Sequence, residues 1–363
     1  MRVNREALLH RLESVHPGLD KKETVQQSDC FVFQKGEVMT FNDEIACRGP
    51  SDLDESFTGA IPAEKLLEVL RKRKEEELEV EITEGHLLLS SKGRRSKVRL
   101  TEDIVLDIHT IEHADHWQPL HEHFGEAIGL VQHCASTSKD QFAVSCVHLT
   151  PDYVEACSSF QLCRWQQETG LTQEALVRRS AIKHITTLGM TEVAEGNAWI
   201  HFRNASGLLL SCRRYLEEYP ALDRILEVKG RTTPLPKGIA EAAALASIFS
   251  SEDKDDNYLD IWLRPGKLRI RGYGITGEHE EIKKINYKGE RLHFRIAPDV
   301  LIGIIKRYSE CILTPERLAV MNGPCRYVAC LMKPAKDLDE PVVVDAEVNG
   351  RSKKKRQVIS EEA

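Results

Sequence analysis

Residues 61–70 read IPAEKLLEVL, and residues 77–100 read ELEVEITEGHLLLSSKGRRSKVRL. The first segment predicts an amphipathic helix over 62–74, because Pro62 suits a helix start and three leucines fall on one face. The second segment alternates apolar and polar residues around short turns, which is typical of hairpin strands. A helix followed by such strands recurs along the chain, and this recurrence is the most informative feature of the sequence.

Six segments in all share the helical spacing of apolar residues. They are 4–15, 62–74, 122–135, 172–188, 237–250 and 298–309. Hairpin patterns follow them at 31–43, 77–100, 142–159, 191–214, 258–273 and 312–332. Corresponding helices lie roughly 110–125 residues apart, which is close to the usual size of a domain.

We therefore interpret the chain as three copies of one α+β unit, each with two helices packed on antiparallel sheets. The segments 109–121 and 226–236 lack periodicity and are interpreted as the joining segments. The predicted domains are residues 1–110, 120–228 and 235–332. Residues 333–363 contain few large apolar groups, so a disordered tail is expected there. Its basic run RSKKKR either contacts DNA or a partner, or is simply solvated.

The composition of the 363 residues is that of an ordinary soluble chain, with 41% hydrophobic and 29% charged residues. No apolar run is long enough to span a membrane, and the N-terminus has no signal-peptide core, so a cytoplasmic protein is expected. Ten cysteines without a CxxC pair indicate reduced thiols. The net charge of −7 does not indicate a simple basic nucleic-acid binder, but basic charge on one face stays open.

Several segments resemble the bacterial DNA polymerase III beta subunit, the sliding clamp. Residues 61–70 look like the second helix of that family's first domain, and residues 96–100 look like a strand that follows it. YPALDRIL at 219–226 is similar to the end of the family's second domain, and YVACLM at 327–332 is similar to its last strand. The order and threefold spacing of these matches carry the resemblance more than any single match.

The resemblance is that of a divergent member. The stretch CSSFQL at 157–162 keeps only the leucine of a Thr-Asp-Gly-His-Arg-Leu segment that is usual in the family. The chain also continues beyond residue 332, where the family's last strand ends.

In the family, two chains of three clamp domains each close into a six-domain ring around double-stranded DNA. The resemblance therefore implies a homodimeric, nucleoid-associated processivity factor that binds DNA without sequence preference and needs no cofactor, metal or membrane. Its partners would be DNA polymerase, the clamp loader and other proteins that carry clamp-binding peptides. The ring tethers these partners and catalyses no reaction.

Basic residues on the predicted helices and on the loop after the first helix would face the DNA. They are Arg5, Arg11, Lys21, Lys22, Lys65, Arg71, Lys72, Arg178, Arg179, Lys183, Lys306 and Arg307. Phosphate contacts carry no sequence information and permit sliding. The alternative is that these residues form the solvated faces of ordinary helices. The helices expected over 122–135 and 237–250 are not basic.

The resemblance also implies a pocket for short peptides between the second and third domains. The matching positions are Cys157, Phe160, Gln161, Leu162, Pro220, Arg224, Ile225, Val328, Cys330 and Met332. An apolar concavity with a few polar anchors suits a short hydrophobic peptide. Plain core packing is the alternative for the apolar members.

Ring closure would pair an edge strand of the first domain with an edge strand of the third domain of a second chain. The matching segments are 96–100 and 280–285, and the interface residues would be Val98, Leu100, Ile282 and Lys283. Charges on both edges indicate that this interface is sensitive to salt.

Two hypotheses therefore remain from different classes. The first is a DNA sliding clamp, and the second is a clamp-fold adaptor that binds clamp-binding peptides without encircling DNA. A histidine cluster at 113–123 is interpreted as an exposed linker rather than as a metal site. The chain contains no GxSxG or HExxH motif and no glycine-rich phosphate loop, so an enzyme is not indicated.

Overall fold

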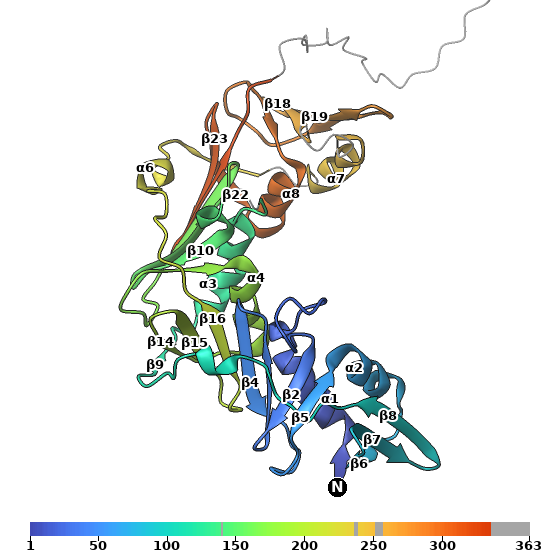
Figure 1. Cartoon of the computed structure of the whole chain (residues 1–363). Coiled ribbons are helices and arrows are strands. Elements are labelled where there is room, and N and C mark those ends of the chain that lie inside the picture. The colour runs from blue at the N-terminus through green and yellow to red at the C-terminus, as the bar shows by residue number, and fades with distance from the viewer. Residues whose placement is uncertain (139–140, 236–238, 251–256, 335–363) are drawn as a thin grey trace, which may run out of the picture.

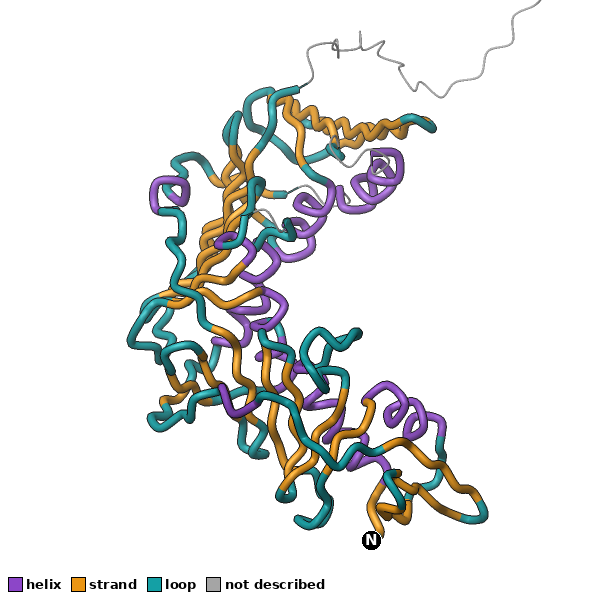
Figure 2. Tube along the Cα trace, viewed as in Figure 1, coloured by secondary structure: helices purple, strands orange, loops and turns teal. Residues whose placement is uncertain are grey.

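A computed structural model describes residues 1–138, 141–235, 239–250 and 257–334. Helices line the concave side of a curved chain, and strands form its convex side (Figures 1 and 2). Within the described residues, one order of elements occurs three times: a strand, a helix, four strands, a helical segment and three strands. We call these runs the first, second and third repeats. The predicted tail lies outside the described residues from residue 335 onward.

The first repeat shows how local sequence positions the helices. Its elements are β1 (Arg2–Asn4), α1 (Arg5–Val15), β2 (Cys30–Gln34), β3 (Glu37–Phe41), β4 (Ile45–Pro50), β5 (Gly59–Pro62), α2 (Ala63–Lys72), β6 (Glu77–Thr83), β7 (His86–Ser91) and β8 (Arg94–Arg99). Asn4 caps α1, because its side chain accepts a hydrogen bond from the amide of Ala7 at 3.0 Å. Helix α2 follows Pro62 and buries the leucines that the sequence placed on one face.

The second repeat contains a prediction that was wrong. Its elements are β9 (Gln118–Pro119), α3 (Phe124–Val131), β10 (Cys146–Leu149), β11 (Tyr153–Cys157), β12 (Gln161–Gln166), β13 (Ala175–Arg178), α4 (Arg179–Ile182), α5 (His184–Leu188), β14 (Glu192–Glu195), β15 (Trp199–Arg203) and β16 (Leu209–Arg213). The first part of the helix expected over 172–188 is instead β13, where Val177 pairs with Val147 of β10. The short apolar run Ala175–Val177 fits a buried strand as well as a helix, and here it pairs within the sheet.

The third repeat follows α6 (Asp223–Leu226), which lies between the repeats. Its elements are β17 (Thr232–Pro234), α7 (Ile239–Ser250), β18 (Leu259–Arg264), β19 (Lys267–Gly274), β20 (Gly277–Lys284), β21 (Leu292–Ile296), α8 (Pro298–Arg307), β22 (Glu310–Leu313), β23 (Arg317–Asn322) and β24 (Cys325–Cys330). Helix α7 lies so close to β19 that a Cβ at Gly272 would overlap the carbonyl oxygen of Ala246. Helices α1, α2, α7 and α8 match their predicted ranges to within two residues.

Two eight-stranded sheets each join two repeats. Their strand orders are β5-β2-β3-β4-β16-β15-β14-β9 and β13-β10-β11-β12-β24-β23-β22-β17. We call the antiparallel pairing of β4 with β16 the first joint, and that of β12 with β24 the second joint. The remaining strands form four-stranded sheets, β1-β6-β7-β8 and β20-β19-β18-β21, at opposite ends of the curved chain (Figure 1).

The sheets bury both faces near the joints. One large core lies between the sheets and the concave helices, and it includes Phe33, Leu66, Phe202 and Ile304. On the opposite face, the connector after β8 covers the first joint with Leu106 and its neighbours. The connector that carries α6 covers the second joint on the convex side (Figure 1). The predicted α+β class with antiparallel sheets is confirmed, and the predicted domain limits stay a prediction.

Candidate functional site

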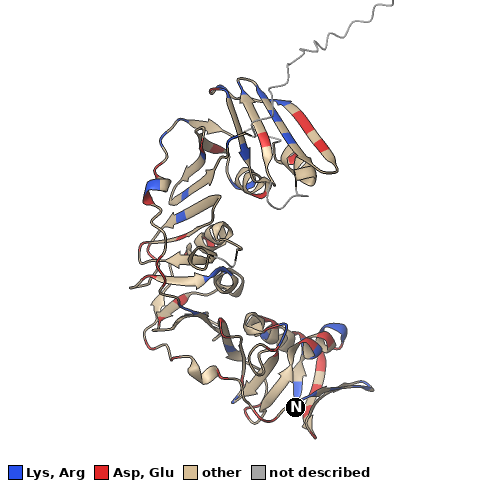
Figure 3. Ribbon diagram, turned by 45° about the horizontal axis from the view of Figure 1, so that its top comes forward, with Lys and Arg blue, Asp and Glu red and all other residues tan. Residues whose placement is uncertain are grey.

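The helices on the concave side carry basic residues together with acidic ones (Figure 3). A cleft of 730 Å³ between α2 and the loop after α1 brings together Lys21, Lys65, Arg71 and Lys72 from the predicted DNA-facing set. Three of these bases already have acidic partners. Glu68 lies 3.3 Å from Lys65 and 2.9 Å from Lys72, and Glu13 lies 2.9 Å from Arg71. These exposed pairs are weak, so a phosphate can compete for the bases.

A second cavity of 420 Å³ lies beside α8 and is lined by Arg179, Arg307 and His133 among others. Burial lowers the pKa of His133, and the neighbouring charges of Arg307 and Arg179 lower it further. The histidine is therefore held in its neutral form beside two permanent cations. Residues of the second and third repeats line this cavity together. Their spacing in the sequence did not predict that they would meet.

Three of the predicted DNA-facing bases make contacts within the chain. Arg5 has a side chain only 11% exposed and donates hydrogen bonds to two backbone carbonyls at the end of α2. Arg11 pairs with Asp52 at 2.9 Å. Arg178 lies in β13 rather than on a helix, and its guanidinium stacks on the ring of Phe142. The four lysines of the set that are exposed and have no ion pair among the described residues are Lys21, Lys22, Lys183 and Lys306.

The outer face of the second joint gathers four of the ten predicted pocket residues. One apolar cluster contains Cys157, Leu162, Val328 and Ile225, together with Tyr219, Leu222 and Leu226 of the connector. Tyr219 donates a hydrogen bond to the sulfur of Cys157 at 3.4 Å. The connector therefore packs over these positions and buries most of them, as the core alternative predicted for the apolar members.

Other predicted pocket residues form an exposed rim beside this cluster. Phe160 is 42% exposed and Met332 is 38% exposed, and Cys330 at the end of β24 is also exposed. The amide of Cys330 donates to the carbonyl of Phe160 at 2.8 Å, which holds the two chain segments together. Pro220 and Arg224 are exposed on the connector. Large apolar side chains left in water next to a covered cluster are a typical docking surface.

Gln161 belongs to the opposite face of the sheet. Its amide donates to the carbonyl of His133 at 3.1 Å, and its side-chain oxygen accepts from the hydroxyl of Tyr327 at 2.6 Å. The prediction grouped it with the pocket because it adjoins Leu162 in sequence. Neighbouring residues of a strand point to opposite faces, so the two cannot share one pocket.

A buried ion-pair network fixes the connector to the second joint. Glu155 is 2% exposed and accepts hydrogen bonds from Arg164 at 2.8 Å and from His148 at 2.8 Å. Arg164 also pairs with Asp223 at the start of α6, at 2.6 Å. Arg164 thereby holds the pKa of Asp223 below its usual value. The sequence analysis missed this network, because its members are scattered over four elements.

The open edges differ from what the sequence suggested for ring closure. Val98 is 6% and Leu100 is 4% exposed, so both side chains belong to the core of their own chain and are not available to a second chain. Ile282 is 51% exposed on β20 and remains the apolar candidate. Lys283 pairs with Glu281 at 3.0 Å.

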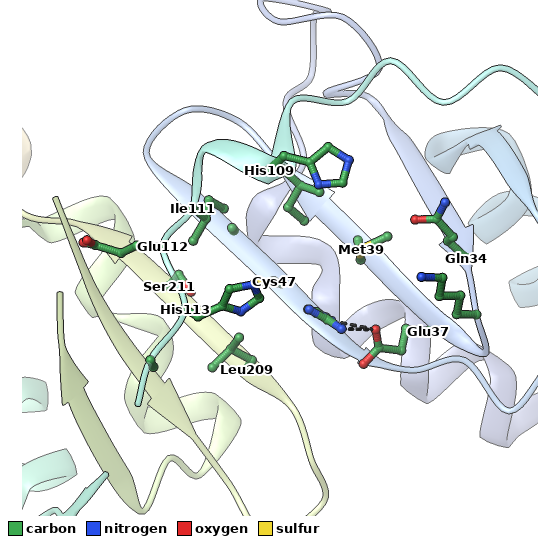
Figure 4. A pocket seen from close by; sticks show the side chains of 15 residues that line it. Gln34, Glu37, Met39, Cys47, His109, Ile111, Glu112, His113, Leu209 and Ser211 are labelled. Carbon is green, nitrogen blue, oxygen red and sulfur yellow. Dashed lines mark hydrogen bonds and ion pairs between the residues drawn. The ribbon is translucent and has the colours of Figure 1, made fainter. Parts of the chain in front are cut away.

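The first joint carries a cavity of 280 Å³ that the sequence analysis did not foresee (Figure 4). Met39 and Leu209 give it apolar walls, and His109 and His113 of the connector lie over it. An ion pair between Arg48 and Glu37 at 2.5 Å crosses one side. The connector sequence around residues 104–114 has no pattern that would reveal this arrangement.

In the part of the chain that the structure describes, no group of three or more histidine, cysteine or acidic side chains is arranged to hold a metal ion. No helix in the same residues has the length and apolar character needed to cross a membrane.

The repeat of elements and the helix-lined concave side define a clamp fold, and the comparisons agree. The DNA polymerase III beta subunit of Thermotoga maritima superposes with a TM-score of 0.78 at 14% identity, over 92% of this chain and 99% of that one. The DnaN sliding clamp of Pseudomonas aeruginosa bound to griselimycin gives 0.76 at 16% identity, with the same coverage. The beta chain of Streptococcus pneumoniae gives 0.76 at 14% identity, again over 92% and 99%.

The chain thus has the fold of the bacterial DNA polymerase III beta subunits, the sliding clamps, in a divergent sequence. No protein-family model and no curated protein matches its sequence.

Proposed function

We propose that the chain is a DNA sliding clamp, a non-catalytic processivity factor that closes as a homodimer around double-stranded DNA. The observation that carries this proposal is the incomplete symmetry of the sheets. Within the described residues, the chain makes two joints between repeats, and the two strands that a third joint needs, β8 and β20, each have a neighbouring strand on one side only. A second copy supplies the missing strands at both ends, which closes a ring.

The concave helices support a DNA-facing role. They combine two cavities that include basic side chains with exposed lysines, and no set of base-reading side chains is required for a protein that slides. The exposed apolar rim at the second joint supports docking of short hydrophobic peptides from a polymerase, a clamp loader or repair proteins. Together these surfaces would hold a partner on its template.

The DNA-facing role is tested by reversing two charges at the end of α8, Lys306→Glu with Arg307→Glu. Each lost phosphate contact lowers the slope of log affinity against log salt by about 0.9, so we expect a slope reduced by up to about 1.8 and at least tenfold weaker binding. Fluorescence anisotropy with two short duplexes of unrelated sequence measures this, and both duplexes should give equal affinity with the parent protein.

The matched control is Lys229→Glu with Arg231→Glu on the connector that carries α6, which makes the same change in net charge. We expect binding within twofold of the parent protein for this variant. Equal salt slopes for the parent protein and the α8 variant would count against the assigned DNA face.

A clamp-fold adaptor that does not encircle DNA is the second candidate. The ion pairs that already occupy Lys65, Arg71 and Lys72 favour it, because they reduce the positive charge offered to phosphate. An adaptor of this kind would bind a polymerase-derived peptide, show no salt-dependent affinity for duplex DNA, and have a solution mass near 41.1 kDa at all concentrations.

A further inference from the structure

The strands of the two joints can be compared residue by residue. At the first joint, the amide of Arg213 donates to the carbonyl of Glu44 at 2.9 Å. At the second joint, the amide of Cys330 donates to the carbonyl of Phe160 at 2.8 Å. The strand pairings continue in step from these two bonds. Each residue of β4 therefore corresponds to a residue of β12, and each residue of β16 corresponds to a residue of β24.

One cross-strand pair on the outer face differs between the joints. Leu162 pairs with Val328 at the second joint, and Ala46 pairs with Ser211 at the equivalent position of the first. At the second joint, the two large side chains pack beneath the connector that carries α6. At the first joint, both side chains are smaller, and both residues line the cavity of 280 Å³. The first joint is therefore hollow at a position that the second joint fills.

The connector after β8 is fixed to the first repeat and to the second repeat on either side of this cavity. On one side, the side-chain oxygen of Gln27 accepts a hydrogen bond from the amide of Leu106 at 3.2 Å. On the other side, the carboxylate of Glu112 accepts from the amides of Ala198 and Trp199 at 2.7 and 3.1 Å. The segment between these anchors is thus held over the sheet without a ligand. Ligand sites are usually preformed in this way.

The charged groups around the cavity leave a positive excess. Glu37 already pairs with Arg48, and the two side chains are 36% and 45% exposed, so a carboxylate from outside can compete for the arginine. Lys35, His109 and His113 also line the cavity, are exposed, and form no ion pair among the described residues. Figure 4 shows the two histidines projecting from the connector. The groups that remain available are therefore cations and hydrogen-bond donors.

A tight turn sets the position of Lys35 at the rim. The turn joins β2 to β3, and its two residues, Lys35 and Gly36, have φ angles of 53° and 75°. Positive values at both positions are those of a two-residue hairpin turn, which follows the twist of its strands. The backbone of Lys35 is therefore placed by the sheet itself.

We propose that this cavity binds a short acidic peptide of a partner protein, which inserts one aliphatic side chain and places its carboxylates against the cations at the rim. Met39, Ile108 and Leu209 supply apolar walls for the inserted side chain. The volume lies just below the range of about 300–1,000 Å³ that whole small ligands occupy, so it suits a single side chain. Different residues carry this inference and the docking rim at the second joint, so each can fail alone.

The positions of the cations favour a peptide over a small organic acid. Lys35 lies on the turn after β2, Arg48 on β4, and His109 and His113 on the connector. One carboxylate cannot reach groups that come from three separate segments. Several carboxylates spaced along an extended chain can do so, and each exposed contact contributes modestly.

The proposal is tested with a display library of random seven-residue peptides. Selection is run in parallel on the full-length parent protein and on Ala46→Leu, and sequences retained only by the parent protein are studied further. We expect them to combine leucine, isoleucine or valine with at least two acidic residues. Fluorescence anisotropy with a labelled selected peptide then measures Kd, which should rise about threefold or more between about 0.05 M and about 0.5 M salt, because salt screens the rim contacts.

Two variants probe the cavity and its rim separately. Ala46→Leu fills the cavity with the side chain found at the equivalent position of the second joint and should raise Kd about tenfold or more. Lys35→Glu reverses a rim charge, leaves the core untouched and should raise Kd about fivefold. The matched control is Lys92→Glu, because Lys92 and Gly93 form the same kind of turn between β7 and β8, with φ angles of 41° and 80°. This control should keep Kd within about twofold of the parent value.

Three outcomes would overturn the proposal. The first is a selection that yields no acidic sequence dependent on Ala46, or a selected peptide whose affinity Lys35→Glu leaves unchanged. The second is binding of free isocaproate, an aliphatic monocarboxylate, as tightly as the selected peptide, which would make the ligand a small organic acid. The third is loss of the acidic peptide in Phe160→Ala with Met332→Ala, which would place it at the second joint and leave the docking rim there standing.

Discussion

The joints within the chain and the open edges at its ends are built from equivalent strands but differ in charge. The joint strands β4, β12, β16 and β24 each carry one arginine and no acidic residue. The open strand β8 carries four basic residues, and β20 carries three glutamates and two lysines. Connectors also cover the two joints on their outer faces.

This difference indicates two kinds of strand pairing in one molecule. The joints form as the chain folds and stay formed, so apolar residues and buried networks can stabilise them. An open edge faces water, and charges keep it from pairing with unrelated strands. The comparison therefore predicts large effects for changes at the joints and small effects on folding for changes at the edges.

The largest effect is expected at the second joint. Arg164→Ala leaves the buried Glu155 without its guanidinium partner and also releases Asp223 at the start of α6. Breaking a buried pair by removing one partner costs about 3–5 kcal/mol, so we expect the free energy of unfolding to fall by that amount. Urea denaturation followed by circular dichroism measures the change.

Arg2→Ala is the matched control on an open sheet. Arg2 and Glu79 form a pair with side chains 76% and 61% exposed, so its loss should cost less than about 1 kcal/mol. If both variants lost a similar free energy of unfolding, the ion pairs at the joint would be no more stabilising than those on the open sheet, which would contradict the difference proposed here.

The repeat was predictable from the sequence because amphipathic helices and alternating strands each leave a periodic signal. The failures share one cause, the packing of elements far apart in the chain. Residues 175–178 were predicted as helix because the three apolar residues 175–177 are too few to show a period, and the neighbouring β10 decides their structure. The joints also leave no local signal in the sequence, since each joint strand pairs with a strand from another repeat that is far away along the chain.

The candidate sites depend on contacts that the sequence does not reveal. The DNA-facing set stays a prediction, and within it Arg5 and Arg178 make packing contacts inside the chain. At the second joint, the resemblance named several positions that lie together in the structure, and the peptide pocket there stays a prediction. The resemblance could not tell that α6 covers Leu162 and Val328, whereas Phe160 and Met332 stay exposed.

A pH titration probes the first joint. His201 is 1% exposed beside β16, where Ser211 lies 2.8 Å from its Nδ1, and burial lowers its pKa to about 4. Glu112 nearby raises this pKa and His113 lowers it, both less than burial does. The folded state resists protonation while the unfolded state binds a proton near pH 6.5. Stability from this group is therefore complete above pH 6.5 and lost as the pH falls toward 4.

At pH 5 this linkage corresponds to a loss of about 2 kcal/mol relative to pH 8. We expect His201→Gln to lose about 2 kcal/mol less than the parent protein over that range in urea denaturation, even if it is less stable throughout. His184, whose pKa burial also lowers to about 4, contributes equally to both proteins and cancels in the difference. His10 is exposed, so the control His10→Gln should show the same change of unfolding free energy with pH as the parent protein. If the free energy of unfolding of His201→Gln changed with pH as much as that of the parent protein, His201 at the first joint would not contribute to the loss of stability in acid.

The smallest effect separates the two joints from each other. The rim positions held by Phe160 and Met332 at the second joint correspond to Glu44 and Tyr215 at the first, where the tyrosine hydroxyl donates to the glutamate at 2.8 Å. Only the second joint therefore offers exposed apolar groups at these positions. We expect Phe160→Ala with Met332→Ala to weaken binding of a labelled peptide from a bacterial replicative polymerase about tenfold, or about 1.4 kcal/mol.

The unfolding free energy should change little in that variant, because both side chains are partly exposed already. Ile275→Ala is the matched control, since Ile275 is 92% exposed but lies on the turn between β19 and β20. Fluorescence anisotropy should give parent affinity for this control. Tyr215→Ala at the first joint should leave peptide affinity unchanged. If it weakened peptide binding as much as the double variant does, the peptide would bind at the first joint. The exposure of Phe160 and Met332 would then not determine where peptides dock.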